Sequence, residues 1–284
     1  MDCSVIIVNY RQKALTEKCI ASVREAIKSV ECEIIVVNNS PDTDSFAQDG
    51  VKIIESPNKG YGSANNIGAG AATGKYLFFL NPDTLVGNDF LPGILKLFED
   101  GRTGIAGCRL IYPGGGFQVS FGSDVSFFGE IKNRKTEKLY SDGNFSALEE
   151  LGRKYSEVTT VDWVSGAAFV IPKYIFDEIG GFDEEYFLYY EDSDLCRRVR
   201  NAGYEVKYYP FSEIVHYKGE NTAQNFYDGI YAQAKKSQLL YYKKHLGLAE
   251  RIFLRIYLVT KYLILSLSFR KTYINLLGIA LGKK

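Results

Sequence analysis

The sequence predicts an α/β fold with a mostly parallel sheet flanked by helices. Short uncharged runs of β-branched and aromatic residues alternate with stretches of helical periodicity along the first third of the chain. Polar residues follow these runs, and the carboxyl ends of parallel strands meet at one edge of a sheet. Open α/β sheets bind their ligands at that edge. We therefore expect the functional residues at the strand ends.

The composition sets limits on the architecture and on the partners. The chain has 284 residues, enough for one large domain or two small ones, and Lys+Arg equals Asp+Glu at 34 each. We therefore expect no nucleic-acid partner, because an anionic ligand must be bound by local groups. The five cysteines form no Cys-x-x-Cys pair, and no basic start or cleavage site precedes the first strand. Both features are typical of a cytoplasmic protein with reduced thiols.

The first four strands are predicted from their apolar runs. They are Ser4–Asn9, Glu33–Val37, Val51–Ile54 and Tyr76–Leu80. Helices are predicted between them over Leu15–Ile27 and, among small residues, over Ser63–Gly74. The glycines at Gly60 and Gly62 would let the backbone approach a phosphate or ribose closely, although such a loop is a weak signal by itself.

The fourth strand ends in a motif with two interpretations. Asn81, Pro82 and Asp83 follow Leu80 directly, and the proline stops the strand because it has no N–H to donate. A carboxylate presented by a rigid turn at this edge suits a divalent cation. The same residues are also ordinary turn formers, and the motif alone does not separate the two.

The middle of the chain contains one segment without periodicity. After a predicted helix over Phe90–Phe98 and a strand over Gly104–Tyr112, residues 113–160 show no regular pattern, and we expect a long flexible excursion there. Order resumes over Val161–Ile171, followed by a helix over Tyr174–Ile179.

An acidic cluster opens a later helix. Glu191, Asp192 and Asp194 precede the apolar face of this helix, where carboxylates serve as caps without any catalytic role. Their crowding exceeds what capping requires, so the cluster is a candidate general base. His216 follows a strand pattern, where a lone histidine is more often a surface residue than a metal ligand.

Several short motifs together resemble a known family. Taken in order, the chain is similar to inverting nucleotide-sugar glycosyltransferases of glycosyltransferase family 2, in particular to bacterial rhamnosyltransferase-like members, over roughly residues 3–220. The motifs are Val5-Ile6-Ile7-Val8-Asn9-Tyr10, Val36-Val37-Asn38-Asn39-Ser40, Asn58-Lys59-Gly60-Tyr61-Gly62, Asn65-Asn66-Ile67-Gly68, Leu80-Asn81-Pro82-Asp83, Gly180-Gly181-Phe182-Asp183, Tyr190-Glu191-Asp192-Ser193-Asp194-Leu195-Cys196, and His216 with Gly219.

The resemblance implies a GT-A fold over residues 1–220 with a helical extension over 221–284, and a role for each site residue. The donor site would include Asn9, Tyr10, Asn38, Ser40, Gly60, Asn65 and Asn81. Asp83 and His216 would hold Mg²⁺ or Mn²⁺, and Asp192 would be the catalytic base. The acceptor would be bordered by Trp163, Gly166, Glu191 and Asp194.

The implied reaction transfers a sugar from a dTDP- or UDP-linked donor to a glycan hydroxyl in cell-surface polysaccharide synthesis. Two departures affect the donor site, since Asn38 stands where an aspartate is usual and Asn65 where many relatives have an arginine. A sugar-nucleotide pyrophosphorylase is an alternative, but its early glycine-rich loop is absent after the first strand. A non-catalytic interaction protein on the same fold is the third possibility.

The C-terminal tail is predicted to contact a membrane surface. Residues Arg251–Phe269 are rich in aliphatic and aromatic side chains, but Arg255 and Lys261 interrupt them. This pattern is poor for a spanning helix and favours one that lies in the interface, with basic neighbours facing anionic lipids. A lipid-linked acceptor would require such a position on the inner face of the cell membrane. The alternative is that the tail packs on the domain or on a second subunit.

Overall fold

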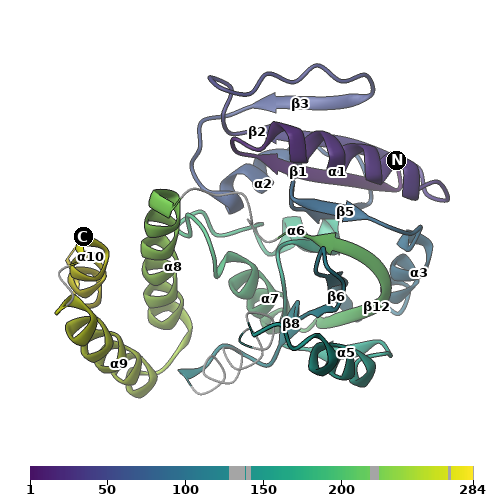
Figure 1. The fold of residues 1–284 in the computed structure, drawn as a ribbon. Helices are drawn as coiled ribbons and strands as arrows, with labels where there is room; N and C mark the ends of the chain where they lie inside the picture. The colour runs from purple at the N-terminus through teal and green to yellow at the C-terminus, as the bar shows by residue number, and fades with distance from the viewer. Residues whose placement is uncertain (128–137, 139–141, 218–223, 268–269, 284) are drawn as a thin grey trace.

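A ten-stranded mixed sheet with helices on both faces forms the core of the protein in the residues that the structure describes (Figure 1). The structure is a computed structural model, and it describes the whole chain except residues 128–137, 139–141, 218–223, 268–269 and 284. The strands follow the order β3-β2-β1-β4-β11-β6-β12-β5, with β7 paired to β6 and β9 paired to β12. The predicted α/β class is confirmed.

The first half of the sheet is parallel, as the sequence predicts. It consists of β1 (Cys3–Asn9), β2 (Cys32–Asn38), β3 (Val51–Glu55) and β4 (Tyr76–Leu80). All seven residues of β1 are buried, since β1 lies between β2 and β4 and has a helix layer on each face. The register pairs Asn9 with Asn38, which brings these two strand ends side by side.

The second half of the sheet is mixed. It consists of β11 (Ala168–Pro172), β6 (Thr103–Ile111), β12 (Glu205–His216) and β5 (Thr84–Val86). Strand β11 runs antiparallel to β4 and β6, whereas β12 is parallel to β6 and antiparallel to β5. Apolar runs indicate burial but not strand direction, so the sequence pattern does not reveal this reversal.

Two hydrophobic cores cover the two faces of the sheet. Alternate residues of a strand point to opposite faces, so Phe78 joins one core and Phe79 the other. The first core holds α1 (Lys13–Ala26), α3 (Leu91–Leu95) and the adjoining 3-10 turn Lys96–Phe98. The second core holds α2 (Tyr61–Gly70), α6 (Lys173–Glu178) and α7 (Glu191–Asn201).

The segment 113–160 contains regular structure, contrary to the prediction. Its elements are β7 (Phe117–Gln118), β8 (Phe121–Gly122), α5 (Phe145–Lys154) and β9 (Thr159–Val161). Strands of two or three residues are too short to show a period, and α5 is capped by Asn144, whose side chain accepts a hydrogen bond from the Ala147 amide. The prediction for residues 128–137 and 139–141 lies outside the described residues.

The tail forms three helices with their own core. They are α8 (Gln224–His245), α9 (Leu248–Ser266) and α10 (Lys271–Ala280). Tyr241, Leu254, Leu258, Tyr262 and Leu276 are buried between them. None of the helices in the described part of the chain is long and apolar enough to cross a membrane. The predicted boundary at residue 220 falls within 218–223, outside the described residues, and stays a prediction.

Candidate active site

The ends of β1 and β2 form a buried polar cluster. Asn9, Asn38 and Ser40 are at most 1% exposed. The Asn9 amide donates hydrogen bonds to Asn38 Oδ1 at 2.9 Å, to Ser40 Oγ at 3.1 Å and to Asp44 Oδ2 at 2.9 Å. The Asn38 amide donates to the Asp44 carbonyl at 2.6 Å. These hydrogen bonds hold the loop after β2 in place. The three side chains would therefore affect ligand binding through the conformation of this loop.

Asp44 is a site residue that the sequence analysis missed. Its carboxylate accepts hydrogen bonds from Asn9 and, at 3.1 Å, from the Ser40 hydroxyl. It thus supplies a negative charge beside Asn38, where an aspartate is usual among the proteins that the sequence resembles. Asp44 lies among the turn formers of the segment Asn38–Asp44, which gives it no distinct sequence signal.

Helix α2 begins with a glycine that packs tightly against a later loop. Gly60 has φ of +112°, and a Cβ at this position would lie 2.6 Å from the Phe187 carbonyl oxygen. The same oxygen accepts a hydrogen bond from the Tyr61 amide at 2.9 Å. This contact joins the glycine-rich loop to the segment that leads into α7. Gly60 is therefore required by close approach as well as by conformation.

We expect Gly60→Ala to lower the free energy of unfolding by about 3 kcal/mol, because it adds a clash to the strain of a positive φ. Gly101→Ala is a matched control, since Gly101 has φ of +67° but a Cβ added there would meet no atom within 4 Å. That control should cost only about 1–2 kcal/mol. Urea unfolding followed by circular dichroism measures both, and equal losses would contradict a specific role for the Phe187 contact.

Asn65 is buried in α2 near the same loop. Its amide nitrogen donates to the Tyr61 carbonyl at 3.0 Å, whereas its Oδ1 is buried with no hydrogen-bond partner among the described residues. The Tyr61 hydroxyl donates to the Gly166 carbonyl at 2.7 Å. Helix α2 thus links the glycine-rich loop to the residues before β11.

Asp83 and His216 lie together at the strand ends, as the metal prediction requires. Asp83 Oδ1 is 3.4 Å from His216 Nε2, and the two residues are 7% and 9% exposed. The other ring nitrogen of His216, Nδ1, is 2.7 Å from Gln118 Oε1. Because β12 pairs with β5, His216 stands opposite Thr84 and next to Asp83. Asn81, half-buried, precedes them, and its carbonyl accepts from the Thr84 hydroxyl at 2.7 Å.

The structure describes no group of three or more His, Cys, Asp or Glu side chains arranged to hold a metal ion, within the ranges it covers. A metal held by Asp83 and His216 would complete its coordination with other ligands, such as oxygen atoms of a bound molecule or water. Mg²⁺ and Mn²⁺ commonly bind in this way beside phosphates.

Asp192 is held at the start of α7 by backbone amides. Its Oδ2 accepts from the Gly166 amide at 2.9 Å, and its Oδ1 accepts from the Ser193 amide at 2.7 Å. Burial raises the pKa of Asp192, although these hydrogen bonds oppose the rise. Two consecutive residues with left-handed backbone, Tyr189 and Tyr190 with φ of +69° each, lead into it. Such strain concentrates at functional sites.

Glu191 differs from its neighbour in its environment. It is 5% exposed, and its Oε2 has no hydrogen-bond partner among the described residues. Burial, followed by the charge of Asp192, raises the pKa of Glu191 well above its usual range. Burial thus raises the pKa of both neighbouring carboxyl groups, and the charge of Asp192 adds to the rise at Glu191.

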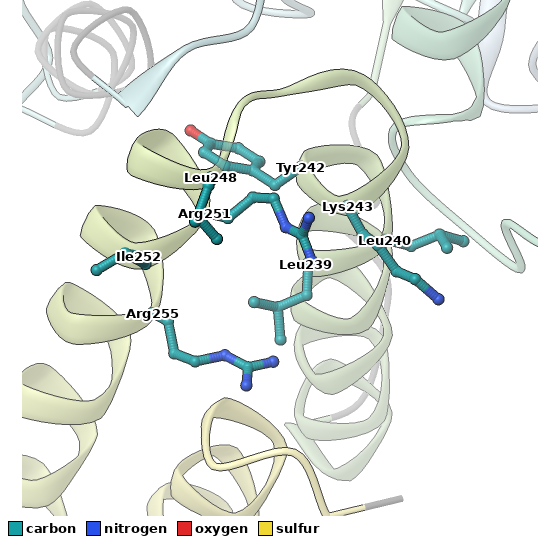
Figure 2. Close-up of a pocket in the computed structure, with 8 residues that line it drawn as sticks. All are labelled: Leu239, Leu240, Tyr242, Lys243, Leu248, Arg251, Ile252 and Arg255. Carbon is teal, nitrogen blue, oxygen red and sulfur yellow. The ribbon is translucent and has the colours of Figure 1, made fainter.

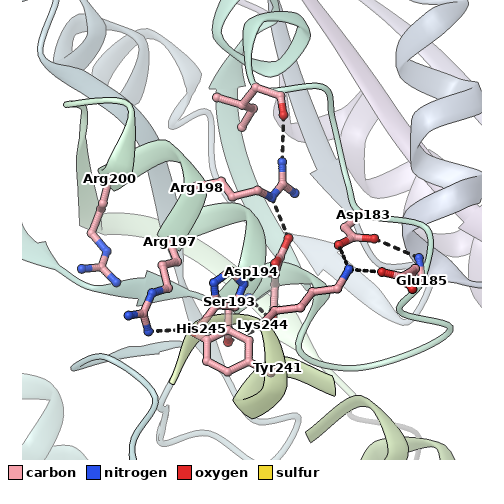
Figure 3. A network of polar contacts seen from close by, with 12 residues as sticks. Asp183, Glu185, Ser193, Asp194, Arg197, Arg198, Arg200, Tyr241, Lys244 and His245 are labelled. Carbon is pink, nitrogen blue, oxygen red and sulfur yellow. Dashed lines mark hydrogen bonds and ion pairs between the residues drawn. The ribbon is translucent and has the colours of Figure 1, made fainter. Parts of the chain in front are cut away.

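Asp194 is buried where α7 meets α8, and its acceptor role stays a prediction. Its carboxylate is 1% exposed and pairs with Arg198 Nε at 2.7 Å and His245 Nε2 at 2.6 Å (Figure 3). Burial raises the pKa of Asp194, but the His245 hydrogen bond and the Arg198 charge outweigh it and lower the pKa overall. Asp194 therefore fastens the tail helix α8 to α7.

The remaining predicted residues lie near the site without contacts that fix a role. Trp163, in β10 (Trp163–Val164), is half-buried against Gly122 of β8, and Gly166 lies three residues later beside Asp192. Tyr10 is half-buried next to the Asn9 cluster. The acceptor role of Trp163 and the donor role of Tyr10 stay predictions.

Comparison with known proteins identifies the family. The profile of Glycosyl transferase family 2 matches residues 4–150. The chain belongs to this family. A second profile, the N-terminal domain of galactosyltransferase, matches residues 148–220. The family 2 protein is therefore a glycosyltransferase with a role in glycan biosynthesis, and the resemblance found in the sequence is confirmed.

Two relatives are rhamnosyltransferases. Rhamnosyltransferase WbbL of Escherichia coli K12 is 29% identical over 215 residues, which cover 69% of this chain and 75% of the relative. The N-acetylglucosaminyl-diphospho-decaprenol L-rhamnosyltransferase of Mycobacterium tuberculosis H37Rv is 34% identical over 87 residues, which cover 31% of this chain and 28% of that protein.

Solved structures confirm the GT-A fold. GalNAc-T7 with UDP, GalNAc and Mn²⁺ superposes with a TM-score of 0.56 at 17% identity, covering 84% of this chain and 51% of that one. TarS residues 1–349 of S. aureus superpose with a TM-score of 0.52 at 13% identity, covering 91% and 79%. At these identities the likeness concerns the fold alone.

Loss of the contact between His245 of α8 and Asp194 of α7 should lower the stability of the protein. We expect His245→Ala to lower the free energy of unfolding by about 2–3 kcal/mol, because it leaves the buried Asp194 carboxylate without one of its two partners. Lys244→Gln is the control, since Lys244 pairs with Asp183 and Glu185 in a more exposed position and should cost less than about 1 kcal/mol. Urea denaturation compares the two variants, and a larger loss for Lys244→Gln would contradict the assignment.

Proposed function

We propose that this glycosyltransferase moves a sugar from a nucleoside diphosphate donor, dTDP- or UDP-linked, to a glycan hydroxyl and inverts the anomeric centre. The observation that carries the proposal is the position of Asp192. Backbone amides hold its two oxygens, and burial raises its pKa above that of an ordinary aspartate. A base of this kind can accept a proton at neutral pH.

The proposed reaction is a single displacement. The acceptor oxygen attacks the anomeric carbon as Asp192 takes its proton, and the bond to the nucleoside diphosphate breaks on the opposite side. Backbone amides hold both oxygens of Asp192, whereas Glu191 Oε2 is buried with no hydrogen-bond partner among the described residues, so Asp192 is the proposed base. Attack opposite the leaving group inverts the configuration at that carbon.

The donor would lie along the strand ends. The buried polar cluster at the ends of β1 and β2 would shape the loop that binds the nucleoside; it consists of Asn9, Asn38, Ser40 and Asp44. The other proposed donor residues are Tyr10, Gly60, Asn65 and Asn81. The buried Oδ1 of Asn65, which has no hydrogen-bond partner among the described residues, is an acceptor that a ligand could use. The structure of GalNAc-T7, which shares the fold, was solved with UDP, and this supports a nucleoside diphosphate donor.

Asp83 and His216 fit a divalent metal. Their oxygen and nitrogen atoms approach to 3.4 Å, and the Gln118 contact at Nδ1 leaves Nε2 directed toward Asp83. Mg²⁺ or Mn²⁺ held there would stabilise the negative charge that develops on the leaving diphosphate. GalNAc-T7 in its solved form contains Mn²⁺.

The acceptor is proposed to be a lipid-linked glycan bordered by Trp163, Gly166 and Glu191. One relative is named for a decaprenol-diphosphate acceptor, and the tail of this chain offers a means of reaching a membrane surface. Exposed apolar side chains lie along α9 and α10, among them Ile256, Leu263 and Ile274 at 52–59% exposure. We propose that these helices hold the enzyme on the surface of the membrane.

A transfer assay tests the proposal. The purified protein is incubated with Mn²⁺, decaprenyl-diphosphate N-acetylglucosamine and, separately, dTDP- and UDP-sugars, and products are identified by mass spectrometry. We expect one donor to yield a lipid product that is one sugar heavier, with inverted configuration by NMR. Retention of configuration, or release of pyrophosphate from a nucleoside triphosphate and sugar 1-phosphate, would contradict the proposal.

A further inference from the structure

A cavity outside the catalytic region lies between the tail helices. It measures about 310 Å³ and is lined by residues of α8 and α9. Its apolar walls include Leu239 and Ile252, and its cations include Arg251 and Arg255 (Figure 2). The strand-end site contributes none of the residues that line this cavity.

The two arginines share one side of α9 and extend toward α8 (Figure 2). They are four residues apart, so their side chains are neighbours and their charges repel each other. Among the described residues neither forms an ion pair with a carboxylate, in contrast to Arg197, Arg198 and Arg200 of α7. Both arginines are exposed, and a phosphate placed between them would relieve their repulsion and accept hydrogen bonds from both.

Helix α9 has an exposed apolar face next to this cavity. Ile252, Phe253, Ile256, Leu263 and Ile264 are 47–62% exposed. At 100° per residue they lie on the side opposite Leu254, Leu258 and Tyr262, which are buried in the tail core. On the same projection Arg255 lies between the two faces, whereas Arg251 lies on the side of Leu258 and Tyr262. A broad apolar face bordered by cations is typical of a helix that lies in a membrane interface.

We propose that the cavity between α8 and α9 binds the phosphate headgroup of an anionic phospholipid while the exposed face of α9 enters the acyl region. This inference rests on the proposed membrane association and adds a specific site to it. Charge complementarity selects the occupant, because each guanidinium presents paired donors that match phosphate oxygens. The apolar walls at Leu239 and Ile252 would contact the glycerol and upper acyl carbons.

Flotation with lipid vesicles tests the site. The full chain is mixed with vesicles of phosphatidylcholine alone or with phosphatidylglycerol added, with no sugar nucleotide present. We expect the wild type to bind the anionic vesicles more tightly. The double variant Arg251→Gln/Arg255→Gln should lose about 30-fold in affinity for them, since each cation at an anionic surface contributes about fivefold.

Two matched variants separate a site from a general basic field. Arg270→Gln/Lys271→Gln removes two exposed cations of the same tail outside the cavity, and Lys18→Gln/Lys28→Gln removes two from the sheet domain. We expect a clearly smaller loss for the tail pair than for the cavity pair, because the tail pair loses only general attraction to the surface and no hydrogen bonds to a bound headgroup, and no loss for the sheet-domain pair. Equal losses for the cavity pair and the tail pair would overturn the site.

The same protein and vesicles distinguish a phospholipid from other occupants of the cavity. An excess of glycerol 3-phosphate should not release the wild type from vesicles, because it cannot supply the apolar contact; release would overturn the assignment to a bilayer lipid. A change of oligomeric state in Arg251→Gln/Arg255→Gln without vesicles, with unchanged flotation, would assign the cavity to a second copy. Absence of any vesicle binding by the wild type would overturn the membrane proposal and leave the transfer chemistry intact.

Discussion

Replacement of Asp192 by asparagine is expected to lower the transfer rate about a thousandfold while donor binding stays within about twofold of the wild type. Asparagine keeps the size of the side chain and an acceptor oxygen for the Gly166 amide, but it cannot take a proton. The measurement is the initial rate of product formation beside calorimetric titration of the donor nucleotide. Undiminished turnover would remove Asp192 from the role of base.

Glu191→Gln is the matched control for this variant. Glutamine keeps the size and polarity of Glu191 and leaves the proposed base in place, so activity should fall less than about tenfold. The dependence of the rate on pH also tests the assignment of Asp192 as the base. A base works when deprotonated, and burial raises the pKa of Asp192, so the acidic limb of kcat/KM should lie at higher pH than for an ordinary aspartate. A limb at or below the pKa of an ordinary aspartate, about 4, would contradict the assignment.

Replacement of Asp83 by alanine should lower the affinity for Mn²⁺ in the presence of nucleoside diphosphate about a hundredfold and reduce turnover by at least as much. The carboxylate is the only anionic group of the proposed pair, and His216 alone offers one neutral nitrogen. Electron paramagnetic resonance measures the Mn²⁺ that remains free.

His216→Gln supplies the comparison at the metal site. Glutamine retains a polar side chain and offers an oxygen in place of Nε2, so the Mn²⁺ affinity should fall less than in Asp83→Ala, by about tenfold. If Asp83→Ala binds Mn²⁺ as the wild type does, the pair at 3.4 Å serves the fold rather than the donor.

The parallel half of the sheet can be predicted from the sequence, because most of its strands are largely buried and therefore almost entirely apolar. Strands such as β1 are apolar at nearly every position, and each precedes a turn or a helix with a clear period. The antiparallel direction of β11 and the short strands β7 and β8 do not follow from the sequence, because strand direction and two-residue pairings leave no periodic signal. The segment 113–160 shows regular structure that depends on tertiary contacts rather than on local pattern.

The residues of the candidate site also differ in whether the local sequence identifies them. Asp83 and Asp192 stand at predictable points, a strand end and a helix start, so the sequence identifies them. Asp44 and His245 act through contacts over long sequence separations, such as the pairing of His245 with Asp194, and their neighbours along the chain do not mark them. The pairing of Asp194 cannot be predicted from the local sequence for that reason, because its partner His245 lies on α8.

Calorimetric titration of the wild-type protein with uridine and thymidine diphosphate, with Mn²⁺ and again with chelator, tests the proposed donor site most directly. We expect one of the two nucleotides to bind with micromolar affinity and binding to weaken at least about tenfold when the metal is removed. The tighter nucleotide would identify the base of the donor. Absent binding, or binding that is the same with metal and with chelator, would contradict the metal-dependent donor site at Asp83 and His216.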